Sequence, residues 1–233
     1  MQPQAISQPH PQAVIRLGVE ERANFITRTY AHLFGAMALF TLIEIALFTT
    51  GAADTIAGAV GGNWLIFLGG FMLVGWLARS VAMGASSKVA QYGALLAFVT
   101  MEALLFVPLL WIANNFAPGV ITNAAIVSLG GFAGLTLIAF LTRKDFSFLR
   151  GVLMFAGIVA AVLIFTSPFT GFSGGLWFSG LMVLVAGGSI LYDTSNVLHH
   201  YPPDKHVSAS LELFASVALL FWYVLQIFLS ADD

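Results

Sequence analysis

Five ionisable side chains lie inside otherwise apolar stretches of this sequence: Glu44, Arg79, Glu102, Asp193 and Glu212. An ionisable group is costly in lipid hydrocarbon, so it usually faces the interior of a helix bundle or a water-filled cavity. Carboxylate oxygens are suitable ligands for calcium, and their charge depends on pH. The pattern therefore indicates ion binding or pH sensing inside a membrane.

Asp193 is the most informative of these residues because its side chain is too short to reach the lipid headgroups. Ser189 and Asn196 are close to it on the same helix, where both could hydrogen-bond its carboxylate. Two other residues have simpler alternatives. Arg79 could extend to the headgroups along its apolar stem, and Glu44 could reach the outer interface.

The composition places these residues in a membrane protein. Of 233 residues, 59% are hydrophobic and only 9% are charged, against about 25% charged in a soluble domain. The mean hydropathy is +0.91. A net charge of −2 without a dense basic run predicts no nucleic-acid partner. The absence of cysteine excludes disulfides, thiolate metal sites and cysteine nucleophiles.

A helix needs roughly 20 apolar residues to cross a bilayer. The sequence holds seven such segments and therefore predicts an all-α, polytopic membrane protein, with residues 21–233 as one transmembrane domain. Residues 1–20, rich in Gln and Pro at their start, are predicted to form a flexible cytoplasmic tail. The predicted spans are 27–49, 64–83, 90–112, 120–141, 150–168, 176–198 and 208–230.

The basic residues predict the orientation, since Lys and Arg concentrate in cytoplasmic connections. All nine of them precede or open the first span or lie at the second, fourth and sixth connections. This alternation places the N-terminus in the cytoplasm and the C-terminus outside. The basic residues are Arg16, Arg22, Arg28, Arg79, Lys88, Arg143, Lys144, Arg150 and Lys205.

Orientation converts sequence position into depth, at about 1.5 Å per helical residue. Arg79, Asp193 and Glu212 then share one level, roughly 6–8 Å below the cytoplasmic edge. Glu102 falls near the middle of the third span, and Glu44 lies toward the outer end of the first. We therefore expect a cytoplasmic-side cluster of two acids and one arginine, with an ion pair between Arg79 and Asp193.

Other chemistry has weaker support in the sequence. His199, His200 and His206 could hold a metal, but the sequence favours a solvated loop there, so no metal site is assigned. No His-Glu-x-x-His or Gly-x-Ser-x-Gly motif occurs. The sequence therefore predicts no enzyme and no cofactor, with calcium as the single candidate ion.

Two stretches resemble signatures of the Bax inhibitor-1 family, in particular its bacterial inner-membrane branch. They are Ile190-Leu191-Tyr192-Asp193-Thr194-Ser195-Asn196 and Leu141-Thr142-Arg143-Lys144-Asp145-Phe146-Ser147-Phe148-Leu149. The resemblance implies seven helices bundled around the last one. It also implies, for some members, a pH-sensitive calcium leak in which two aspartates share a proton and an arginine pairs with the first. Asp193 and Arg79 match the first aspartate and the arginine.

The second aspartate has no match. Ser216 occupies its position, and Glu212 lies one helical turn earlier on the same face. Two functions therefore stay open. One is a pH-sensitive calcium leak or ion sensor, with Glu102, Glu44, Ser189, Asn196 and Ser216 as a candidate path. The other is a regulatory partner of a membrane protease, since the bacterial branch associates with membrane-protease quality control.

The predicted orientation can be tested with a reporter that fluoresces only in the cytoplasm. Fused after Asp233, it should stay dark, because seven crossings from a cytoplasmic N-terminus place that end outside. Fluorescence from this fusion in living cells would mean six crossings or a last segment that re-enters.

Overall fold

The computed structural model describes residues 13–171 and 174–231. Within these ranges the chain forms eight α-helices, one short 3₁₀ helix and no strand. Seven of the helices are long and apolar enough to cross a membrane, which confirms the predicted all-α, seven-span class. The elements are η1 (Val14–Arg16), α1 (Val19–Thr49), α2 (Ala52–Gly62), α3 (Trp64–Gly84), α4 (Lys88–Phe116), α5 (Val120–Thr142), α6 (Leu149–Thr170), α7 (Gly175–His199) and α8 (His206–Ala231).

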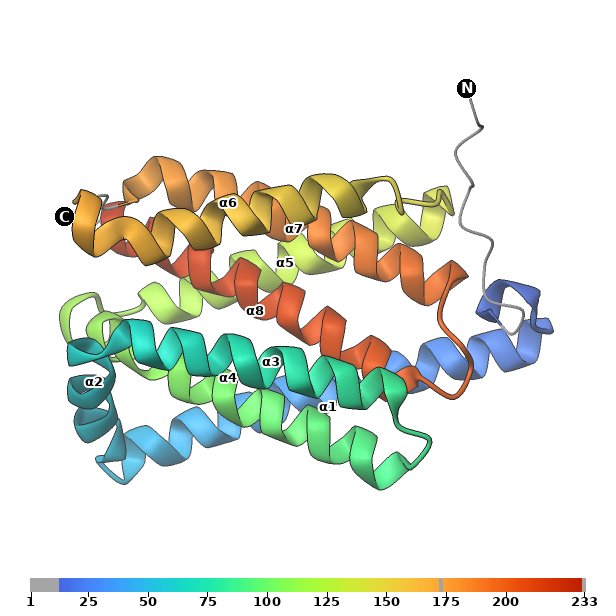
Figure 1. The fold of residues 1–233 in the computed structure, drawn as a ribbon, viewed down its shortest axis with the longest axis horizontal. Helices are drawn as coiled ribbons and strands as arrows, with labels where there is room; N and C mark the ends of the chain where they lie inside the picture. The colour runs from blue at the N-terminus through green and yellow to red at the C-terminus, as the bar shows by residue number, and fades with distance from the viewer. Residues whose placement is uncertain (1–12, 172–173, 232–233) are drawn as a thin grey trace.

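The long helices run up and down, so that the connections gather at two ends of the bundle (Figure 1). The α3–α4, α5–α6 and α7–α8 connections and the start of α1 share one end, at the right of Figure 1. We call it the basic end, because Lys88, Arg143, Lys144 and Lys205 lie there. The opposite, far end holds the short helix α2 and the end of α8. The first and last spans therefore begin at the basic end.

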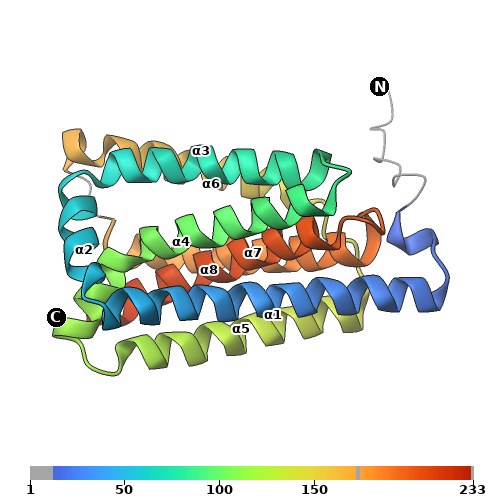
Figure 2. The same ribbon diagram turned by 90° about the horizontal axis from the view of Figure 1, so that it is seen from below.

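Helix α8 is the centre of the bundle (Figures 1 and 2). It packs against α1, α3, α4, α5 and α7. Its apolar side chains Leu211, Leu213 and Leu225 are fully buried, as the family resemblance implied for the last helix. The outer helices are far less enclosed: in α6 Ala160 is the one buried residue among those described.

Glycine in left-handed conformation permits two of the sharp reversals. Gly51 (φ 75°) separates α1 from α2, and Gly119 (φ 88°) precedes α5. A side chain at these φ values would clash with its own backbone. Gly75 has a different role, since a Cβ there would lie 3.3 Å from the Phe98 ring and 3.4 Å from Arg79 Nη1. Its small size leaves room for the Arg79 side chain.

The predicted tail needs one correction. Ala13 and Val14 are fully buried, and the Val14 amide donates a hydrogen bond to the Tyr201 carbonyl at 2.9 Å. Helix α1 begins at Val19, whereas the predicted span began at residue 27. The prediction missed the first turns because they are polar and carry no apolar signal. Ala13 and Val14 thus pack against the basic end, with Leu17 partly buried beside them, while the rest of residues 15–20 is exposed. Residues 1–12 lie outside the described residues.

Candidate ion site

Arg79 and Glu212 form an ion pair between α3 and α8. The Arg79 Nε donates to Glu212 Oε2 at 2.8 Å, and the guanidinium lies over the Phe98 ring at 5.2 Å from its centre. The predicted partner of Arg79 was Asp193, and this was wrong. The three residues do line one cavity, but a common depth would not determine which side chains face each other.

Asp193 instead accepts a hydrogen bond from Ser216. The Ser216 Oγ lies 2.5 Å from Asp193 Oδ2, and both residues are buried between α7 and α8. Ser216 was aligned with the second aspartate that the resemblance implied. A hydroxyl at that position can always donate to a carboxylate, whether or not a second acid is nearby. Its contact with Asp193 agrees with the alignment.

The other polar neighbours of Asp193 are arranged differently from the prediction. The Ser189 Oγ donates to its own helix, to the Val185 carbonyl at 3.0 Å, rather than to Asp193. Asn196 lies on the wall of the cavity that Asp193 lines, without a hydrogen bond between the two side chains among the described contacts. Ser216, on another helix, takes the role predicted for them.

A cavity of about 950 Å³ opens near the basic end, and we call it the basic-end cavity. Seven of the eight predicted site residues line it, which brings together side chains from α3, α4, α7 and α8. These residues are Arg79, Glu102, Ser189, Asp193, Asn196, Glu212 and Ser216. Their association is a finding, whereas their roles stay predictions.

A second cavity, of about 720 Å³, extends toward the far end between α3, α4, α6, α7 and α8. We call it the far-end cavity. Gly61 and Trp64 lie along it where α2 meets α3, and Gly174 and Gly175 lie where α7 begins. The two cavities have five lining residues in common: Phe71, Glu102, Leu153, Ser189 and Leu219. Glu102 is therefore the acid at which they meet.

Glu102 is buried on α4, at 5% exposure, and its Oε2 has no hydrogen-bond partner within the described part of the chain. Glu44 is also buried, and neither of its oxygens has a partner there. Glu44 lines neither of the two cavities. It is the one predicted site residue that the structure places apart from the others.

Sequence reasoning missed a set of contacts that fixes the α5–α6 loop to the end of α7. The Phe146 amide donates to Ser195 Oγ at 2.9 Å, and His200 Nε2 lies 3.0 Å from Asp145 Oδ2. Partial burial raises the pKa of Asp145, but hydrogen bonds from Ser147 and the nearby His200 outweigh it and lower that pKa. The two stretches that resemble the family signatures are therefore in contact. Their shared resemblance was the one sequence signal that could have suggested this contact.

No group of three or more His, Asp or Glu side chains that could hold a metal occurs within residues 13–171 and 174–231. The three histidines around the α7–α8 connection also diverge. His199 Nδ1 lies 2.9 Å from the Ser195 carbonyl, His200 faces Asp145, and the His206 ring packs against His32. Of these three histidines, His200 lines the basic-end cavity, beside carboxylate, hydroxyl and amide side chains.

Seven apolar spans with buried charges define a multi-pass membrane protein, its helices suited to a lipid bilayer. The sequence matches the family described as Bax1-I, inhibitor of apoptosis-promoting Bax1, over residues 22–233. The chain therefore belongs to the Bax inhibitor-1 family.

Individual relatives match over shorter stretches. Bax inhibitor 1 of Schizosaccharomyces pombe is 36% identical over 115 residues, which is 48% of this chain and 43% of that protein. A BI1-like protein of Arabidopsis thaliana is 30% identical over 119 residues, 49% of this chain and 46% of that protein. The modulator of FtsH protease YccA of Escherichia coli is 29% identical over 121 residues, 50% of this chain and 55% of that protein.

The chain thus spans about half the length of the curated relatives it matches. None of these three relatives has the name of an enzyme. A further match, from another strain of Escherichia coli, is named inner membrane protein YccA. The relatives support membership of the family and a membrane location. Ion binding, by contrast, is inferred from the geometry of the site itself.

The ion pair between Arg79 and Glu212 can be tested by charge reversal. Arg79→Glu or Glu212→Arg alone should lower folded yield, because each places like charges about 3 Å apart. The accompanying loss in free energy of unfolding should be smaller than the roughly 3–5 kcal/mol expected for a fully buried pair, because 42% of the Arg79 side chain is exposed. The double reversal should restore most of the yield measured by size-exclusion chromatography. Arg79→Asp with Asp193→Arg should give no such recovery, and equal recovery of the two double variants would contradict the assignment.

Proposed function

We propose that this protein is a pH-sensitive calcium leak of the Bax inhibitor-1 type, acting in a bacterial inner membrane. The observation that supports the proposal is the meeting of two cavities at Glu102, one extending toward each end of the bundle. A leak needs a route across the apolar layer, and the two cavities together extend along the bundle on both sides of Glu102. Phe71, Leu153 and Leu219 also line both cavities.

The charges along the basic-end cavity favour a cation. Three acids, Glu102, Asp193 and Glu212, line it together with two arginines, Arg79 and Arg150, so the acids exceed the arginines by one. Rings of carboxylates select cations in channels, and calcium prefers six to eight oxygen ligands. Carboxylate, hydroxyl and amide oxygens from Asp193, Ser216 and Asn196 would supply part of that set. Water in the cavity would complete it.

The proposed pH dependence follows from the separate partners of the two acids at this level. Glu212 is compensated by the direct contact with Arg79, whereas Asp193 has a neutral hydroxyl donor. Protonation of Asp193 would remove one negative charge from the cavity and leave the Arg79–Glu212 pair in place. Loss of that charge would weaken the attraction for calcium and change the packing of α7 against α8.

The test is calcium flux into vesicles that contain the purified protein, measured over a pH series. Asp193→Asn should flatten the pH dependence, because it removes the titrating charge while keeping the size of the side chain. Glu212→Gln should shift the midpoint, because it leaves Arg79 without its partner beside Asp193. Glu44→Gln is the matched control: it neutralises a buried acid that lines neither cavity, so the profile should match the parent.

An intact pH profile for well-folded Asp193→Asn would contradict the sensor role. The absence of protein-dependent calcium flux at every pH would contradict the leak itself. Both variants should therefore be compared with the parent for thermal unfolding in the same detergent, so that lost flux is not confused with lost fold.

The alternative function is regulation of a membrane protease. It is favoured by the relative named modulator of FtsH protease YccA. The predicted cytoplasmic segment before the first span would then be the contact. Deletion of residues 1–12, which stops before the buried Ala13, should reduce co-purification with membrane proteases and leave calcium flux unchanged. Unchanged co-purification would show that this segment is not the contact.

A further inference from the structure

The far-end cavity has the size and composition of a small-molecule site. Its volume of about 720 Å³ lies within the roughly 300–1,000 Å³ typical of ligand pockets. Its wall is mainly apolar and includes aromatic rings from α3, α4, α6 and α8, among them Phe71, Phe106, Phe165 and Trp222. Such rings attract cations over their faces, best where water is excluded.

Glu102 lies where this cavity narrows toward the basic end. It is 5% exposed, and its Oε2 has no partner in the described part of the structure. The nearby cation, Arg79, lines the basic-end cavity but not the far-end cavity. Its Nε is bonded to Glu212. A carboxylate without a direct partner at the end of an aromatic cavity favours a positively charged group there.

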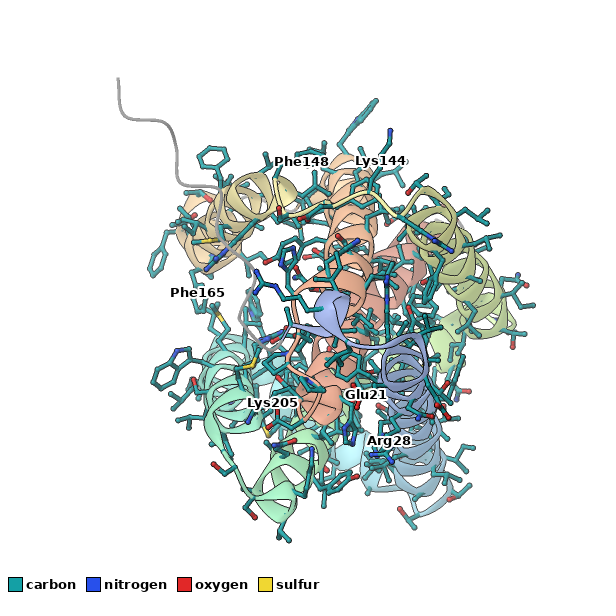
Figure 3. The ribbon with its side chains drawn as sticks, turned by 90° about the vertical axis from the view of Figure 1, so that its right-hand side faces the viewer. Glu21, Arg28, Lys144, Phe148, Phe165 and Lys205 are labelled. Carbon is teal, nitrogen blue, oxygen red and sulfur yellow. The ribbon has the colours of Figure 1, made fainter. Side chains whose placement is uncertain are left out.

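The cavity also has a route from the bilayer. Its wall includes Phe71 and Met72 of α3 and Phe165 of α6, and Figure 3 shows Phe165 between these two helices. Helix α6 packs chiefly against α7, so it does not close the space beside α3. Both helices turn apolar side chains outward, including Leu73 and Phe155. Met72, on the cavity wall, is itself 47% exposed, so the wall reaches the apolar surface that lipid would cover.

We propose that the far-end cavity binds an amphipathic organic cation, with its ammonium group against Glu102 and its apolar body among the aromatic rings. A neutral molecule of the same shape would bury the carboxylate without pairing it. An anionic one would be repelled by it. The site shares Glu102 with the proposed calcium route, but binding requires only the carboxylate and the cavity, so it can be measured without ion flow.

The experiment uses the full chain in nanodiscs of zwitterionic lipid, in calcium-free buffer, with labelled dodecyltrimethylammonium as the probe. Binding above that of empty nanodiscs should saturate. Glu102→Gln should weaken it about tenfold or more, equivalent to roughly 1.4 kcal/mol per tenfold. Glu44→Gln, which neutralises a buried acid outside the cavity, should bind like the parent. Unlabelled dodecanol and dodecyl sulfate should compete poorly.

A second variant tests the cavity without changing the charge. A Cβ added at Gly157, on the far-end cavity wall, meets no atom within 4 Å. Gly157→Phe should therefore fill part of the cavity without disturbing Glu102, and it should weaken binding of the probe. The proposal is overturned if Glu102→Gln binds like the parent, if dodecanol displaces the probe as well as an unlabelled cation, or if no binding exceeds empty nanodiscs. Thermal unfolding of each variant checks that its fold is intact.

Discussion

The need to keep buried charge partnered in lipid determines how the centre of this bundle is arranged. Helix α8 carries Glu212 and Ser216 one turn apart, so both project from the same face. Glu212 binds Arg79 on α3, and Ser216 binds Asp193 on α7. These two contacts connect α8 to both sides of the basic-end cavity. The packing around them follows the same requirement, since Gly75 leaves the space that the guanidinium occupies.

The unpaired acids mark the places where this requirement is not met by the protein alone. Glu102 and Glu44 are both buried and have oxygens without hydrogen-bond partners within the described residues. An unsatisfied buried carboxylate costs stability unless it is protonated or meets a cation. At Glu102 two cavities meet, so a mobile cation can approach. Glu44 lines neither cavity, so no cation has a comparable approach to it.

The fold was predictable because a run of about 20 apolar residues is a local signal. Helix α2 and the polar start of α1 were missed because an 11-residue segment and a charged first turn carry no such signal. The cluster of Arg79, Asp193 and Glu212 was predictable because orientation fixes depth. The partner of Arg79 was not, because rotation of each helix about its axis depends on packing. The far-end cavity depends on how α6 sits beside α3, which no local pattern records.

The contrast with the arrangement that the family resemblance implied explains why the serine matters. There, two aspartates share a proton and the arginine pairs with the first. Here Ser216 replaces the second aspartate, and the remaining acid, Glu212, lies one turn closer to the basic end. Arg79 follows that acid and leaves Asp193 with a hydroxyl donor. A hydroxyl donates to the carboxylate without carrying a charge, so the direct partner of Asp193 is neutral. If the proposed pH sensing holds, a single aspartate, Asp193, would be the group that responds to pH.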